Sequence, residues 1–257
     1  MTTTKQTISF VGSGNVATHL ALALKAAGHQ ILQVFSREYD HAERLAHQVF
    51  AEPIDKLALL YPTADVYVLA VSDDALFDLA LDLRLREALV VHTSGTVPMK
   101  VLEPISRKCG VAWSPQTFVR EVAMQYDQLP FCIEGSTPQV EQQIAALMET
   151  VSQKIFRLNS EQRQWLHLSA VMVSNFGNAL NALAQEQLER HDLPFDVLTP
   201  LIQTTAEKAL HGDLWSLQTG PARRRDQKTI DRHRQMLLDQ PRLKELYELF
   251  TQIIQER

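Results

Sequence analysis

The sequence predicts an α/β domain, built on a mostly parallel sheet with helices on both faces, followed by an all-α C-terminal domain. Over residues 1–159, short apolar runs that suit buried strands alternate with helical patterns, which is typical of a parallel sheet joined by helices. After residue 159 only helical patterns follow. We therefore expect two domains, at 1–159 and 160–257.

The individual elements follow from these patterns in chain order. The run at 65–73 is apolar without alternation, as expected for a strand covered on both faces. Strands are predicted at 7–12, 30–36, 65–73, 88–95, 111–114, 130–135 and 154–159. Helices are predicted at 15–28, 39–50, 74–84, 98–109 and 137–153, and then at 160–191, 194–212, 226–239 and 241–255.

Composition excludes several classes of protein. A net charge of -5 argues against general nucleic-acid binding, and no uncharged apolar run reaches the length of a membrane span. The first ten residues hold one lysine and no apolar stretch, so we expect no signal peptide and a cytoplasmic protein without a membrane partner. Cys109 and Cys132 are expected to be reduced, packed thiols, and neither they nor the histidines show the spacing of a metal site.

A glycine-rich turn joins the first predicted strand to the first predicted helix. Gly12, Gly14 and Ala17 form the pattern G-x-G-x-x-A. The first glycine permits a tight turn, the second lets a pyrophosphate approach the backbone, and the alanine lets helix and strand pack closely. This predicts a Rossmann-type dinucleotide site that includes the loop residues Gly12, Ser13, Gly14, Asn15 and Val16. The alternative is a Rossmann fold with an empty site or with another ligand, as in methyltransferases.

The end of the second strand indicates which dinucleotide binds. An NAD site usually has an acidic residue there, on the ribose hydroxyls. This chain has Ser36 and Arg37 instead, and a guanidinium suits the 2′-phosphate of NADP. We therefore expect NADP rather than NAD, although Glu38, one place later, keeps NAD open and Arg37 could be a solvated loop cation. Three residues at the next strand end should also border the cofactor: Ala70, Val71 and Ser72.

Two later strand ends supply candidates for the nicotinamide end of the cleft. His92 and Ser94 close the strand at 88–95, and His92 could donate a proton or be structural. Gln116 follows the next strand and is a candidate for substrate binding, or simply part of a loop.

The first long helix of the second domain carries an unusual set of polar residues. With about 100° per residue, His167, Ser174, Asn178 and Asn181 fall on one narrow face, with Asn175 to one side. We take His167 and Asn175 as catalytic candidates and Asn178 as a substrate-binding candidate. The alternative is a hydrogen-bond network between helices, including helices of a dimer.

A basic segment, 223–234, stands out in an acidic protein. Cations near a helix N-terminus oppose the helix dipole, so an external anion would explain them. Arg224 is the candidate for binding that anion, against the alternative of a solvated charged face.

Several motifs, taken together, resemble a known family. They are "GSGNVA", "AVSDDA", "HTSG", "QTF", "PFCIEG", "SNFGNAL" and "LQTGPARRRD....H", and they span residues 12–233 in order. The front half resembles the NADP-binding domain of pyrroline-5-carboxylate reductases and of deazaflavin-dependent NADP oxidoreductases. The whole chain resembles a bacterial family in which a Rossmann-like domain precedes a helical domain of unknown function. This resemblance implies roles for Gly220, Pro221, Arg224, Asp226 and His233.

One difference from enzymes of related architecture argues against their catalytic mechanism. β-Hydroxyacid dehydrogenases of related architecture use a helix lysine followed one turn later by an asparagine. If Asn175 takes the place of that asparagine, the lysine position is Val171, and residues 161–190 contain no lysine.

Two hypotheses follow for the function. The first is an NADP-dependent oxidoreductase that transfers a hydride between nicotinamide and a small carbonyl or imine substrate. The alternative is a non-catalytic NADP(H)-binding regulatory or sensor protein. In either case the apolar first helix of a small helical domain leads us to expect a homodimer through that domain.

Overall fold

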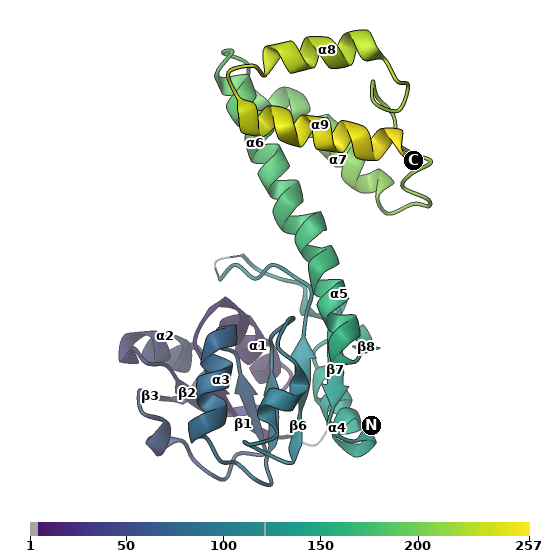
Figure 1. The fold of residues 1–257 in the computed structure, drawn as a ribbon. Helices are drawn as coiled ribbons and strands as arrows, with labels where there is room; N and C mark the ends of the chain where they lie inside the picture. The colour runs from purple at the N-terminus through teal and green to yellow at the C-terminus, as the bar shows by residue number, and fades with distance from the viewer. Residues whose placement is uncertain (1–4, 121) are drawn as a thin grey trace. The chain divides into compact units, whose positions relative to one another are not determined.

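The computed structural model describes residues 5–120 and 122–257, which fall into two compact units, Met1–Leu180 and Asn181–Arg257. The first unit contains an eight-stranded sheet with helices on both faces, and the second contains helices and loops but no strand in its described residues (Figure 1). The predicted fold class is confirmed.

The sheet has the strand order β3-β2-β1-β4-β5-β6-β7-β8. Neighbouring strands run parallel except β6 and β7, which are antiparallel. From the central β1, the chain builds β2 and β3 on one side and then returns to place β4 on the other. This reversal is the point at which ligands bind in open α/β sheets. The strands are β1 (Thr7–Val11), β2 (Gln30–Phe35), β3 (Glu52–Ile54), β4 (Val66–Leu69), β5 (Leu89–His92), β6 (Lys108–Trp113), β7 (Phe131–Gly135) and β8 (Ile155–Arg157).

Two apolar clusters cover the faces of the sheet. One holds α1 (Asn15–Ala26), α2 (Tyr39–Val49) and α4 (Pro138–Met148), and the other holds α3 (Asp73–Asp82) and the short 3₁₀ helix η2 (Met99–Leu102). Adjacent strand residues such as Phe10 and Val11 belong to different clusters, because successive side chains of a strand point to opposite faces.

Two local predictions differ from the structure. The helix predicted at 98–109 is wrong, because only Met99–Leu102 is helical and β6 begins at Lys108. Pro104 explains the early end, since proline lacks an N–H and disfavours helical backbone in the residue before it. Strand β3 was not predicted, because three residues at a sheet edge are too short to show a period.

The predicted long helix is present, with an interruption. It consists of α5 (Ser160–Val171), a π-helical turn η4 (Met172–Phe176) and α6 (Gly177–Glu189). A capping box fixes its start, since Asn159 Oδ1 accepts the N–H of Gln162 at 2.8 Å and Gln162 Oε1 accepts the N–H of Asn159 at 3.0 Å. The predicted domain boundary falls at this cap, whereas the compact units divide after Leu180.

The second unit contains, after α6, the helices η5 (Phe195–Leu198), α7 (Thr199–Lys208), α8 (Gln227–Met236) and α9 (Pro241–Gln255). Asp226 caps α8, because its Oδ1 accepts the N–H of Thr229 at 3.2 Å. As predicted, the described residues beyond β8 form no strand. No helix in the described part of the chain has both the length and the apolar character needed to cross a bilayer. Within the same residues, no three His, Cys, Asp or Glu side chains gather as a metal-binding group.

Candidate functional site

A cleft of about 790 Å³ opens at the carboxyl ends of β1, β2, β4, β5 and β6, where the strand order reverses. Two residues predicted for the nicotinamide and substrate end, Ser94 and Gln116, line it. All ten residues predicted to bind the cofactor line it as well: Gly12, Ser13, Gly14, Asn15, Val16, Ser36, Arg37, Ala70, Val71 and Ser72. The structure therefore gathers residues from five separate loops into one site.

The glycine turn has the backbone that a pyrophosphate site needs. Gly12 has a φ of +116°, and a Cβ placed on it would lie 2.2 Å from the carbonyl oxygen of Ala70. Around Gly14, by contrast, no atom lies within 4 Å of where a Cβ would be, so this side of the turn is open. Helix α1 begins there with no side-chain cap and no acidic residue in its first turn. Its first N–H groups are thus available to an anion, which fits a dinucleotide.

The end of β2 presents a cation to the cleft. Arg37 lines the cleft, is exposed, and has no ion pair or side-chain hydrogen bond among the described residues. Glu38 is not among the lining residues, and its Oε2 lies 3.4 Å from His41 Nε2. The acidic group one place late therefore pairs with a residue of α2 and does not line the cleft.

Helix α3 contributes a wall of the cleft that was not predicted from the sequence. Asp73, Asp78 and Asp82 all line the cleft, together with the apolar Leu57 and Leu79. On a helix, carboxylates at such spacing resemble an ordinary solvated face, so no signal in the sequence separates them from one. Their charge makes this wall acidic.

The segment after β6 lies against the glycine turn. Asn15 Nδ2 donates to the carbonyl oxygen of Phe118 at 2.9 Å, and Arg120 Nη2 donates to the carbonyl oxygen of Ser13 at 2.9 Å. Gln116, from the same segment, reaches the cleft. Arg120 was not predicted, because a lone arginine in a loop carries no pattern.

His92 lies behind the cleft and does not line it. Its side chain is fully buried, and its Nδ1 accepts the N–H of Ser94 at 3.1 Å. Burial, reinforced by the positive charge of Arg163, lowers the pKa of His92 to about 3. His92 is therefore neutral near pH 7 and braces the loop, so the structure does not support its predicted role as a proton donor.

Ser94 is placed at the cleft and also shapes its own loop. Its Oγ accepts the N–H groups of Thr96 at 3.1 Å and of Val97 at 3.0 Å. The hydroxyl thereby holds the turn that carries Gly95, another lining residue, and this end of the cleft has a fixed backbone.

His167 lies next to this loop. A Cβ on Gly95 would lie 2.5 Å from His167 Cδ2, so the ring packs directly against the loop backbone. The His167 ring also lies next to the indole of Trp113, and the centroids of the two rings are 5.7 Å apart. His167 is half-buried and is not among the residues that line the cleft, but it packs against Gly95, which does line it.

The π turn changes the polar face that was predicted for the long helix. A π turn holds one residue more than an α turn, so it rotates the following residues by roughly 100° relative to an unbroken helix. The single narrow face predicted for His167, Ser174 and Asn178 is therefore wrong. The same rotation turns Asn175 toward the face of His167. Ser174 Oγ lies 3.2 Å from Thr117 Oγ1, which brings the π turn to the segment after β6.

Besides His92 and His167, three further predicted site residues do not line the cleft. Asn175 and Asn178 are exposed and make no side-chain hydrogen bond among the described residues. Arg224 belongs to the second unit, where it is exposed and precedes the cap of α8. Their predicted roles remain predictions.

Two family models match the chain. Residues 7–95 match the model described as "NADP oxidoreductase coenzyme F420-dependent", and residues 129–254 match a domain of unknown function, DUF2520. This pair of matches confirms the resemblance drawn from the motifs. None of the curated proteins compared with the chain matches it.

Solved structures extend this result. The protein BF3122 from Bacteroides fragilis is 39% identical, with a TM-score of 0.90 over 98% of this chain and 99% of that chain. A pyrroline-5-carboxylate reductase from Coxiella burnetii is 18% identical, with a TM-score of 0.58 over 99% of this chain and 97% of that one. An imine reductase from Myxococcus stipitatus, solved with NADP+, is 14% identical, with a TM-score of 0.68 over 97% and 93%. The last two share the fold.

Proposed function

We propose, from the premise that this chain belongs to the family of BF3122 from Bacteroides fragilis, that it is an NADP-dependent oxidoreductase. In this proposal it transfers a hydride between nicotinamide and a small carbonyl or imine substrate. The observation that carries the proposal is the gathering of all ten predicted cofactor residues in one cleft. Two proteins of the same fold, the pyrroline-5-carboxylate reductase and the imine reductase, bear names that support a C=N substrate.

Each part of the cleft then has a task. The N–H groups of the glycine turn and of α1 hold the pyrophosphate, and the open side of Gly14 allows its approach. Arg37 binds the 2′-phosphate through its planar fork. NADPH, when bound, supplies the hydride, and the protein holds and orients the reacting groups.

We assign the proton donor to His167. It is half-buried, it packs against the Gly95 loop, and Trp113 limits the movement of its ring. Ser94 and Gln116 line the same cleft and can orient a carbonyl or imine by hydrogen bonds. Asn175 and Asn178 are further candidates for substrate contacts. The absence of lysine from 161–190 is consistent with a histidine in this role.

A substrate panel tests the proposal. Purified protein is incubated with NADPH and, in turn, small cyclic imines, semialdehydes and ketoacids, and the loss of NADPH absorbance is followed. For an active substrate, His167→Asn should lower kcat by roughly 100-fold or more with little change in the Kd of NADPH. His191→Asn, which alters an exposed histidine, is the control and should retain activity. Saturable NADPH binding with no turnover on any substrate would favour the alternative, a regulatory or sensor protein.

We also propose a homodimer through the helical domain, in the cytoplasm. Large apolar side chains are exposed in both units, including Trp165 (65%), Val173 (81%) and Leu201 (62%). Within the second unit, only three described residues are buried: Ala222, Ile230 and Thr251. A unit of this size needs more buried apolar surface than that to be stable, and a second copy could supply it. The free, buried Cys109 and Cys132 suit a reducing compartment.

Light scattering coupled to gel filtration tests the dimer. Wild-type protein should elute at twice the 29.1 kDa of one chain, and Val173→Asp combined with Leu201→Asp should shift the mass toward one chain. A wild-type protein that is monomeric at micromolar concentration contradicts the proposal.

A further inference from the structure

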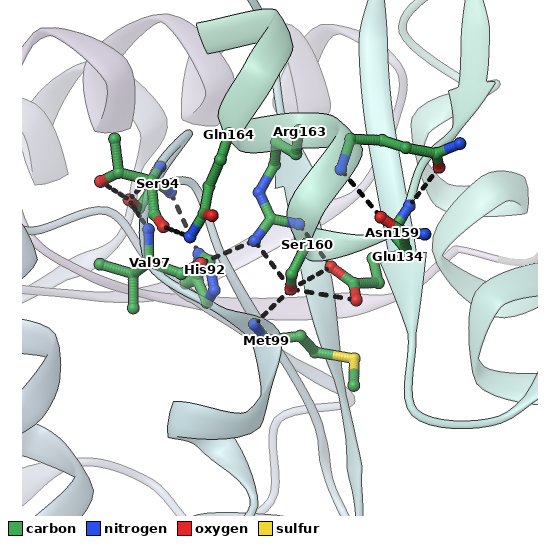
Figure 2. Close-up of polar contacts among 11 residues, drawn as sticks. His92, Ser94, Val97, Met99, Glu134, Asn159, Ser160, Arg163 and Gln164 are labelled. Atoms are coloured by element: carbon green, nitrogen blue, oxygen red, sulfur yellow. Dashed lines mark hydrogen bonds and ion pairs between the residues drawn. The ribbon is translucent and has the colours of Figure 1, made fainter. Parts of the chain in front are cut away.

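The loop 93–99, which runs from the end of β5 to the first residue of η2, is held from behind by the start of helix α5. Arg163 Nη2 donates to the carbonyl oxygen of Val97 at 2.6 Å, and Gln164 Nε2 donates to the carbonyl oxygen of Thr96 at 2.8 Å (Figure 2). The loop is therefore bonded to two consecutive residues of one helix through its own backbone.

Ser160 extends this connection to the sheet. Its Oγ accepts the N–H of Met99 at 3.1 Å and donates to the carboxylate of Glu134, with distances of 2.8 Å and 3.1 Å to the two oxygens. Arg163 also forms an ion pair with Glu134. Figure 2 shows the guanidinium of Arg163 between the carboxylate of Glu134 on β7 and the 93–99 loop. One buried arginine thus joins helix, sheet and loop.

Arg163 is buried, and a buried guanidinium is an unusual group for a purely structural contact. Its side chain is only 1% exposed, whereas that of its partner Glu134 is 16% exposed. Removing a guanidinium from water costs free energy that a single ion pair often fails to offset. An apolar side chain of similar size could fill the same space, so the retained charge points to a requirement for the hydrogen bond to Val97.

The opposite side of the same loop forms the cleft. Thr93, Ser94 and Gly95 all line it, and Thr96 Oγ1 donates to the carboxylate of Asp73, another lining residue. The position of this wall therefore depends on how the loop is fixed at Val97 and Thr96.

We infer that Arg163 is a positioning residue: it fixes the 93–99 loop so that Thr93, Ser94 and Gly95 form the nicotinamide-side wall of the cleft. The ligand in this inference rests on the proposed function, but the effect of Arg163 on the loop does not. Arg163 itself touches no ligand, because it lies behind the loop and does not line the cleft.

Hydrogen exchange in the ligand-free protein tests the effect on the loop. In Arg163→Lys, the charge opposite Glu134 is kept but the two-pronged contact with Val97 and Glu134 is lost. The amides of residues 93–97 and of Met99 should then exchange about tenfold faster, the size expected for losing a hydrogen bond to a charged group. Arg157→Met is the matched control, because Arg157 forms an exposed ion pair with Glu141 away from the loop. Unchanged exchange over 93–99 in folded Arg163→Lys would overturn the inference.

Ligand binding provides a second readout that a general loss of stability does not mimic. For NADPH, Arg163→Lys should raise the Kd about tenfold, whereas for 2′,5′-ADP, which lacks nicotinamide, the change should be under about twofold. The double variant Glu134→Gln/Arg163→Met removes both charges and so avoids an unpaired carboxylate. It should show the same difference, with a higher Kd for NADPH and a nearly unchanged Kd for 2′,5′-ADP. Equal losses for both ligands would overturn the inference. If wild-type protein bound neither ligand, the proposed function would fail, while hydrogen exchange would still decide the role of Arg163.

Discussion

The carbonyl oxygen of Ala70 lies where Gly12 would carry a side chain, only 2.2 Å from the position of a Cβ. This close approach joins the turn after β1 to the end of β4, since Ala70 N also donates to Val11 O at 2.8 Å. The positive φ of Gly12 adds a second reason for glycine. Gly14, two residues later, has neither constraint, so the two glycines serve different purposes.

Replacing these glycines one at a time should separate folding from binding. Gly12→Ala places a Cβ against backbone that cannot move aside, so both the melting temperature and NADPH binding should fall. Gly14→Ala has free space around it, so stability should change by about 1 kcal/mol or less, the cost of a poorer N-cap. NADPH affinity should still fall, because the methyl group blocks the pyrophosphate. Thermal unfolding and NADPH titration of both variants check this, and wild-type affinity in Gly14→Ala would contradict it.

Arg37 should determine the preference for NADP. In Arg37→Met the guanidinium is lost while the length of the side chain is largely kept, so the Kd of NADPH should rise about tenfold or more. The Kd of NADH should stay within about twofold, because NADH has no 2′-phosphate. Arg44→Met, on α2 and outside the lining of the cleft, is the control. A similar loss of affinity for both cofactors would show that Arg37 does not bind the 2′-phosphate.

The buried His92 should make stability depend on pH. Burial lowers the pKa of His92 to about 3 in the folded protein, against 6.5 in the unfolded chain. Between these values the unfolded chain binds one more proton, so the free energy of unfolding falls as the pH drops from 6.5 toward 3. The contribution of this residue is roughly 1.4 kcal/mol per pH unit.

Urea unfolding between pH 7 and pH 4 measures this slope. His92→Asn keeps an acceptor near the position of Nδ1 for the N–H of Ser94 but does not titrate. The slope of its unfolding free energy against pH should therefore be smaller than that of wild type, by the equivalent of about one bound proton. His41→Asn changes an exposed histidine and serves as the control. Equal slopes for wild type and His92→Asn would contradict this account of His92.

Both thiols should be unreactive in the folded protein. Burial raises the pKa of Cys132 to about 11 and also raises that of Cys109, and the thiolate is the reactive form. Ellman's reagent at pH 8 should therefore label no thiol in native protein and two per chain after unfolding in guanidinium. Rapid labelling of native protein would show that one of these cysteines is accessible.

The sequence predicted well which residues of the first strand ends meet at the cleft, because that part of the cleft is formed by backbone geometry with a local pattern. The turn around Gly12 needs particular residues at fixed spacing, and residues such as Ala70 and Ser36 follow strands at recognisable positions. The carboxyl ends of parallel strands meet at one edge, so locating the strands was enough to bring these residues together.

The other end of the site depends on packing that no local pattern records. His92 ends its strand as predicted, yet it is buried and faces Arg163, a contact between residues far apart in the chain. The π turn at Met172–Phe176 has the same apolar and small polar residues as an α-helix, so its rotation of the following residues could not be foreseen. Arg163 looks in the sequence like any arginine on a polar helix face.

The central claim is that the cleft at the strand reversal binds NADP. Calorimetric titration of the purified protein with NADPH and, separately, with NADH tests it most directly. The account predicts saturable binding of one NADPH per chain, at least about tenfold tighter than NADH, because only NADPH carries the phosphate for Arg37. No saturable binding of either cofactor below about 1 mM would contradict the account.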